Sequence, residues 1–144
     1  MATTRKAEIL LVDDNPADLD LFRDAIGASG QGFKVNTVPD GEEAIAFLYR
    51  SGKFRAVPRP DLVVLDLNLP RKNGRAVLAN VKSDPTLRMI PIVVFTTSGA
   101  SNDISDCYAL GANCYVSKPG SLSEFRKTVH SIEHFWFGVA RLTS

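Results

Sequence analysis

The segment that decides the fold reads Leu62-Val63-Val64-Leu65-Asp66-Leu67-Asn68-Leu69-Pro70. Its first four residues are aliphatic and include two β-branched valines, which is typical of a strand buried on both faces of a parallel sheet. The strand ends at Asp66, and Pro70 prevents the pairing from continuing. Because open α/β sheets bind ligands beyond the carboxyl ends of their strands, Asp66 is either a functional carboxylate or an ordinary turn former. The other strand ends decide between these interpretations.

Four other segments have the composition of strands, and amphipathic helical patterns separate all five. These four expected strands cover residues 8–12, 33–38, 91–98 and 114–119. The second alternates between polar and apolar residues, as expected near a sheet edge. The apolar stripe of the last helix comprises Leu122, Phe125, Val129, Ile132 and Trp136. Five strands alternating with five helices predict an α/β fold, a doubly wound five-stranded parallel sheet of flavodoxin-like order.

The chain has 144 residues, which suits one domain over residues 1–144 with a core over about residues 7–138 and no output domain. Hydrophobic residues make up 44% and charged residues 23%, as in globular proteins. No apolar run approaches the roughly 18 residues of a membrane-spanning helix. The first residues lack the apolar core of a signal peptide, so we expect a cytoplasmic protein. The net charge of +1 argues against nucleic acid as a partner.

Two further features of the sequence are its pair of cysteines and a basic segment before the central strand. Cys107 and Cys114 lack companions at metal-ligand spacing, so we expect reduced, partly buried core residues. Residues 49–60 combine four basic side chains with glycine and prolines, which predicts a long basic loop. That loop is either a solvated surface excursion or a docking site for a partner.

The ends of the predicted strands carry carboxylates, a hydroxyl and an ammonium group. In chain order these residues are Asp13, Asp14, Asp66, Thr96 and Lys118. Strand ends of a parallel sheet share one edge, where neighbouring carboxylates raise one another's pKa unless a cation offsets them. An all-oxygen cluster suits magnesium better than zinc, and magnesium usually accompanies phosphate oxygens. With Lys118 and Thr96 as donors, these residues fit a phosphoryl group on Asp66, because a carboxylate is a nucleophile toward phosphorus.

Together these residues resemble the receiver domain of two-component response regulators, from about Ala7 to the end of the chain. The resemblance implies that Asp66 is the phosphoacceptor and that magnesium is the cofactor. It also implies that Asp14 binds the metal directly, that Asp13 acts mainly through water, and that the backbone carbonyl of Asn68 completes the metal shell. Such a protein is a phosphoacceptor rather than an enzyme, with only slow self-phosphorylation and self-dephosphorylation.

The same resemblance implies a conformational switch. Thr96 matches the switch hydroxyl, and Tyr115 matches the aromatic switch position. Lys118 matches the family's lysine, and the Lys118–Pro119 peptide bond is often cis in that family. Ser98 either tunes the access of hydrolytic water or is a plain residue at a helix N-terminus.

The chain further resembles a narrower group within the family. No DNA-binding or catalytic segment follows the last helix, which implies a stand-alone regulator whose output is a changed surface. The loop ending in Pro58-Arg59-Pro60 and the aromatic tail His134-Phe135-Trp136-Phe137 are similar to single-domain regulators of bacterial phytochrome histidine kinases. We therefore expect a phytochrome-type histidine kinase upstream and an unidentified protein downstream.

Two other functions use similar residues. Phosphatases of the haloacid dehalogenase type also combine an aspartate nucleophile with a hydroxyl, a lysine and magnesium. They need an acid two residues after the nucleophile, where this chain has Asn68. A pseudo-receiver, which binds partners without phosphorylation, is expected to have lost acidic residues or the lysine, and none is lost here.

The last helix carries a predicted homodimer interface. At about 100° per residue, Phe135 and Phe137 fall on either side of the apolar stripe, so part of their surface should be exposed, with Trp136 between them. Neighbouring exposed aromatic residues favour association, and one patch can meet its own copy about a two-fold axis. The alternative is a helix that wraps further round the core. His130 and His134 are expected to be surface or interface residues.

Overall fold

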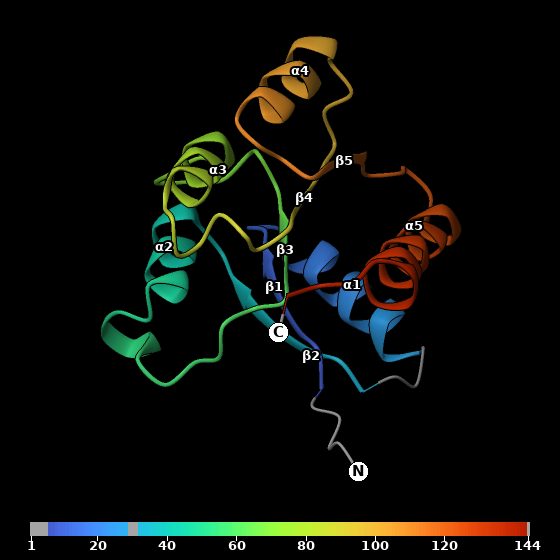
Figure 1. Ribbon diagram of the computed structural model, residues 1–144. Helices are drawn as coiled ribbons and strands as arrows, with labels where there is room; N and C mark the ends of the chain where they lie inside the picture. The colour runs from blue at the N-terminus through green and yellow to red at the C-terminus, as the bar shows by residue number, and fades with distance from the viewer. Residues whose placement is uncertain (1–5, 29–31, 144) are drawn as a thin grey trace.

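A single parallel sheet forms the centre of the computed structural model, which describes residues 6–28 and 32–143 (Figure 1). Its strands are β1 (Glu8–Val12), β2 (Lys34–Val38), β3 (Leu62–Leu65), β4 (Ile92–Thr96) and β5 (Cys114–Ser117). They run in the order β2-β1-β3-β4-β5, and every neighbouring pair is parallel. This is the flavodoxin-like order, with β2 at an edge and β3 in the centre, so the predicted fold is confirmed.

Helices cover both faces of this sheet (Figure 1). They are α1 (Pro16–Gly27), α2 (Gly41–Leu48), α3 (Gly74–Ser83), α4 (Ser101–Ala109) and α5 (Leu122–His134). The buried residues of α1 and α5 share one core cluster with the strands, and those of α2 and α3 share a second cluster on the opposite face. In the described part of the chain, none of the helices combines the length and the apolar character that a membrane crossing requires.

The central strand β3 shows why its sequence decides the fold. Leu62 and Val64 belong to the cluster beneath α1 and α5. Val63 and Leu65 point the opposite way, into the cluster beneath α2 and α3. All four side chains are fully buried. A strand with helices on both faces needs apolar residues at every position, and β3 supplies them.

One prediction for α5 is wrong. The apolar stripe was expected to begin at Leu122, but this side chain is 54% exposed. Residues 121–124 are all exposed, so the helix meets the sheet only from Phe125 onward. Phe125, Val129 and Ile132 are buried as expected. Helical periodicity gives the direction in which a side chain points, whereas its burial also depends on how far the sheet extends.

The predicted basic loop contains local structure. A 3₁₀ turn at Gly52–Phe54 places the ring of Phe54 against that of Phe47, with centroids 5.3 Å apart. Lys53 Nζ lies 2.8 Å from Glu43 Oε1, and the Arg59 guanidinium donates to the carbonyl oxygen of Thr86 (2.7 Å). The segment is thus attached to α2 and to the loop after α3.

Candidate functional site

Backbone hydrogen bonds fix two aspartates side by side at the carboxyl edge of the sheet. The N–H of Asp66 donates to the carbonyl oxygen of Val12 (2.9 Å), and the N–H of Asp13 donates to that of Val38 (3.2 Å). Both aspartate side chains are buried. They stand where the strand order reverses, between β1 and β3, which is the position at which folds of this order bind their ligands.

Lys118 lies among the carboxylates of this edge and contacts three of them. Its Nζ donates to Asp13 Oδ2 at 2.6 Å, to Asp18 Oδ2 at 2.8 Å and to Asp66 Oδ2 at 3.0 Å. An ammonium group has three N–H donors, so these contacts use its full capacity. The side chain is only 4% exposed, and its charge therefore acts on the carboxylates with little screening by water.

The protonation of this edge depends on Lys118. Burial raises the pKa of Asp13, and hydrogen bonds from Lys118 and from the backbone N–H of Asn15 oppose this effect only in part. Burial lowers the pKa of Lys118, but hydrogen bonds to Asp13 and Asp18 outweigh it and leave the pKa well above its usual value. The lysine is therefore charged at neutral pH and reduces the repulsion between the carboxylates.

Asp13, Asp14 and Asp66 form an acidic cluster that can hold a metal ion. One oxygen from each lies within 4.8 Å of the others. Asp14 is exposed, which leaves room for water ligands. The backbone N–H of Asn68 lies 3.3 Å from Asp66 Oδ1, so the residue predicted to complete the metal shell is beside the cluster. Carboxylate and water oxygens suit hard divalent cations such as magnesium, and the predicted ligands fit such an ion.

The predicted switch residues lie close to the acidic cluster. Thr96 is fully buried, and its hydroxyl has no hydrogen-bond partner among the described residues. A buried hydroxyl left without a partner costs about 1–3 kcal/mol, so it gains when an acceptor enters the site. The half-buried Tyr115 donates its hydroxyl to the carbonyl oxygen of Ser98 (2.9 Å). The Lys118–Pro119 peptide bond, often cis in the resembled family, is trans.

The structure adds Asp18 to the site, a residue that sequence reasoning missed. It lies in the first turn of α1 and joins Asp13 and Asp66 around Lys118. Acidic residues are common in first turns because they favour the helix dipole. No sequence signal therefore distinguishes Asp18 from an ordinary residue at the start of a helix.

A second polar network ties α3 to α4 next to the loop that follows Asp66. Asp103 accepts hydrogen bonds from Ser98 Oγ and from the guanidinium of Arg75. Arg75 also donates to Asp106 Oδ2 at 2.7 Å. This network borders a hollow of about 260 Å³, whose lining residues are Leu67, Asn68, Asn73, Arg75, Ser98 and Asp103. Ser98 thus helps to hold the first turn of α4 at the mouth of the site.

Gly74, the first residue of α3, allows the loop after Asp66 to fold back closely. A Cβ atom here would lie 2.3 Å from the carbonyl oxygen of Asp66 and 2.6 Å from Leu67 Cα. Both neighbours are backbone atoms, so we expect Gly74→Ala to displace this loop and to destabilise the protein by about 1–3 kcal/mol in urea unfolding. Gly27→Ala is the matched control, because a Cβ there meets nothing within 4 Å. Equal stability of Gly74→Ala and wild type would contradict this prediction.

The residues of the predicted dimer interface lie at the end of α5, away from the acidic cluster. A π-helical turn over Phe135–Val139 extends this helix. Phe135 is 50% exposed and packs edge-on against Trp136, with ring centroids 5.1 Å apart. Phe137 instead packs against Phe33, with ring centroids 4.9 Å apart. Phe135 therefore supplies the exposed surface, whereas Phe137 extends the core.

Comparison with known sequences finds the family of this chain. The profile described as "Response regulator receiver domain" matches residues 9–130. Response regulator Rcp1 of Synechocystis sp. (strain ATCC 27184 / PCC 6803 / Kazusa) is 42% identical over 134 residues, which cover 93% of this chain and 91% of Rcp1. The similarity therefore extends over nearly the whole of both proteins.

Solved structures give the same result. The phosphorylated cyanobacterial phytochrome response regulator RcpA is 47% identical, with a TM-score of 0.95 over 97% of this chain and 100% of RcpA. The Mn²⁺-bound form of Rcp1 is 41% identical, with a TM-score of 0.92, and the match covers 96% of this chain and 99% of Rcp1. Receiver domains bind a divalent metal and accept a phosphoryl group, and they are not enzymes that turn over a substrate. This chain belongs to the receiver domains of two-component response regulators, and it is close to those of phytochrome signalling.

Proposed function

We propose that Asp66 accepts a phosphoryl group from a partner histidine kinase, with magnesium bound, and that a downstream protein recognises the changed surface. The contact of Lys118 with Asp66 and Asp13 is the observation that carries this proposal. This contact places the buried positive charge of Lys118 at the carboxyl end of β3. A phosphoryl group on Asp66 would add negative charge at this point, where the ammonium group can donate charge-assisted hydrogen bonds.

Each residue of the site has a distinct part in the transfer. An Oδ atom of Asp66 forms a bond to phosphorus as the bond between phosphorus and a histidine nitrogen of the kinase breaks. Magnesium would be held by Asp14, Asp66 and the backbone carbonyl of Asn68, and by Asp13 mainly through water. It would then offset the negative charge on the phosphoryl oxygens. Lys118 Nζ, which lies 3.0 Å from Asp66 Oδ2, would donate a hydrogen bond to an oxygen of the transferred phosphoryl group.

We propose that the kinase is of the phytochrome type, because RcpA, a phytochrome response regulator, is 47% identical to this chain. Such a role places the protein in the cytoplasm, where ATP is available to the kinase. The test uses a phytochrome-type histidine kinase and an unrelated histidine kinase, each loaded with labelled phosphate from ATP. We expect faster transfer of label from the phytochrome-type kinase. Equal rates from both kinases would contradict the assignment of the partner.

Thr96 and Tyr115 are proposed to carry the signal from Asp66 to the surface. The Thr96 hydroxyl, which has no partner among the described residues, would move to donate to a phosphoryl oxygen. This movement vacates space into which Tyr115 turns. Tyr115 would then give up its hydrogen bond to the carbonyl oxygen of Ser98, and with it a link between β5 and the start of α4. The surface over α4 and β5 changes as a result.

We also propose that the chain forms a homodimer through an aromatic patch, defined as Phe135, Trp136 and Phe137. Phe135 and Trp136 line an apolar hollow of about 180 Å³ together with Cys114 and Val116 of β5. β5 is an edge strand of the sheet, so this hollow lies at its open side. An apolar hollow next to the exposed Phe135 ring and the half-buried Trp136 favours association with a second copy.

Phe135→Ser is expected to weaken this dimer about tenfold or more, because exposed aromatic residues often dominate interface energies. Phe137 is left unchanged because it packs against Phe33. Analytical ultracentrifugation with and without acetyl phosphate and magnesium measures the effect. If phosphorylation strengthens the dimer, Thr96→Ala should keep the basal association and lose the response. A wild type that remains monomeric in both states rules out the dimer.

A further inference from the structure

Helix α4 has fewer apolar contacts with the core than the other helices have. The structure describes all nine residues of α4, and Cys107 is the only buried one among them. Its N-cap residue is Ala100, and the first turn has no capping side chain among the described residues. By contrast, α1, α2, α3 and α5 each have a capping side chain and at least three buried residues. A helix with so few buried contacts moves more easily than its neighbours.

Arg75 of α3 attaches α4 by polar contacts instead. Its guanidinium donates to Asp103 and, at 2.7 Å, to Asp106 Oδ2. These carboxylates belong to the first and second turns of α4, so one side chain holds two turns of this helix. The planar guanidinium presents its N–H groups in a fixed fork, which suits two carboxylates at once better than an ammonium group does.

The same network reaches Tyr115, the proposed switch residue, through Ser98. Asp103 also accepts a hydrogen bond from Ser98 Oγ. The carbonyl oxygen of Ser98 in turn accepts from the hydroxyls of Tyr115 (2.9 Å) and Ser117 (3.3 Å). A continuous set of hydrogen bonds therefore joins Arg75 on α3 to Tyr115 on β5.

We propose that Arg75 is a positioning residue that opposes the switch. Through Asp103 it holds Ser98, whose carbonyl oxygen accepts the hydrogen bond from the Tyr115 hydroxyl. This inference rests on the proposed function, in which Tyr115 gives up that hydrogen bond once Asp66 carries a phosphoryl group. The network stabilises the conformation that has this hydrogen bond, so weakening the network lowers the free energy needed to leave it. A ligand that favours the switched conformation then binds more tightly.

Beryllofluoride, which forms a tetrahedral mimic of a phosphoryl group on a carboxylate, is the probe for this inference. Its affinity in the presence of magnesium is measured by fluorine NMR for the wild type and for Arg75→Gln, which removes both ion pairs. We expect the variant to bind about two- to fivefold more tightly, the range that partly exposed ion pairs support. A purely structural role would leave the affinity unchanged or lower it, so a gain is specific to the proposed role.

Three further variants identify the path of the effect. Arg23→Gln is the matched control, because this exposed arginine of α1 donates to Thr37 Oγ1 (3.1 Å), and it should bind beryllofluoride like the wild type. Arg75→Lys keeps the charge but loses the fork that spans two carboxylates, so its gain should be smaller. In a Tyr115→Phe background, Arg75→Gln should add little, because the hydrogen bond to Ser98 is already absent.

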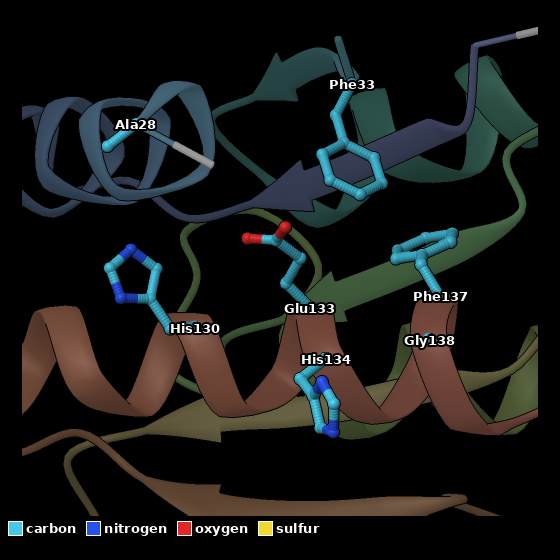
Figure 2. A pocket seen from close by; sticks show the side chains of 7 residues that line it. All are labelled: Ala28, Phe33, His130, Glu133, His134, Phe137 and Gly138. Atoms are coloured by element: carbon cyan, nitrogen blue, oxygen red, sulfur yellow. The ribbon is translucent and has the colours of Figure 1, made fainter. Parts of the chain in front are cut away.

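Hydrogen exchange without beryllofluoride tests the attachment of α4 itself. The amides of Ser101–Ala109 should exchange about two- to fivefold faster in Arg75→Gln than in the wild type. The end of α5, where Phe137 packs against Phe33 on the other face of the sheet (Figure 2), is the internal reference and should exchange at an unchanged rate. Because the Arg75 side chain is partly exposed, we expect Arg75→Gln to fold normally, and circular dichroism checks this.

The outcomes separate this inference from the proposed function. A wild type that binds no beryllofluoride overturns the proposed function and this inference with it. A wild type that binds beryllofluoride, together with an unchanged or lower affinity in Arg75→Gln, overturns the inference alone. A gain that is equally large in the Tyr115→Phe background also overturns it, because the effect would then not pass through Ser98.

Discussion

Replacing Asp66 with asparagine is expected to abolish phosphorylation by acetyl phosphate and magnesium. The amide has nearly the same shape as the carboxylate, so the packing around β3 should persist, but it is not a nucleophile toward phosphorus. We expect the wild type to take up one base-labile phosphate and Asp66→Asn to take up none, as measured by mass spectrometry of the intact protein. Asp20→Asn, an exposed position on α1, is the matched control and should react like the wild type.

The outcomes of this experiment distinguish the rival functions. A full equivalent of phosphate on Asp66→Asn would show that another residue is the acceptor. A wild type that takes up no phosphate from acetyl phosphate or from any kinase would instead favour the pseudo-receiver. Continuous release of inorganic phosphate from small phosphate esters would favour the phosphatase, although Asn68 offers no acid for the leaving group.

Lys118→Ala is expected to give the largest loss of stability. It removes the ammonium group that contacts Asp13, Asp18 and Asp66. Truncating one partner of a buried ion pair typically costs about 3–5 kcal/mol, because the remaining charge is left uncompensated. Urea unfolding in the absence of divalent ions measures this loss. Lys127→Ala, whose ammonium is exposed and lies 3.6 Å from Glu124, should change the stability by less than about 1 kcal/mol.

The pH dependence of Lys118→Ala follows from the same charges. Burial already raises the pKa of Asp13 in the folded wild type, and removal of the lysine withdraws the hydrogen bond and the positive charge that lower it. In the variant, the folded state therefore holds protons more tightly than the unfolded chain. Its stability deficit should shrink as the pH falls through the raised pKa, and it should also shrink when magnesium is added. A deficit that is small and independent of pH would contradict this account.

The fold could be predicted from the sequence because its central elements depend on local patterns. Leu62–Leu65 is apolar at every position, as a strand covered on both faces must be. The exposed first turn of α5 could not be predicted, because the period of the helix does not reveal where the sheet ends. Leu122 fits the helical pattern, yet it is 54% exposed and belongs to neither core cluster.

The residues of the candidate site that stand at strand ends could also be predicted from the sequence, whereas those on helices could not. Strands that are recognisable in the sequence end at Thr96 or just before Asp13, Asp66 and Lys118, so the topology alone brings these residues together. The contact of Asp18 with Lys118 and that of Arg75 with Asp103 arise between loops and helix ends. Such contacts depend on three-dimensional packing, for which one sequence carries no local signal.

The span of the Lys118 contacts has a consequence for protein synthesis. Its bond to Asp13 joins residues 105 positions apart, and its bond to Asp66 joins residues 52 apart. Chains emerge from the ribosome with the N-terminus first, so the aspartates appear long before the lysine that holds them. An unfinished chain thus carries Asp66, the proposed acceptor, without the positive charge of Lys118. Under the proposed function, the site is therefore complete only after β5, the last strand to be translated, has paired with β4 and brought Lys118 to Asp66.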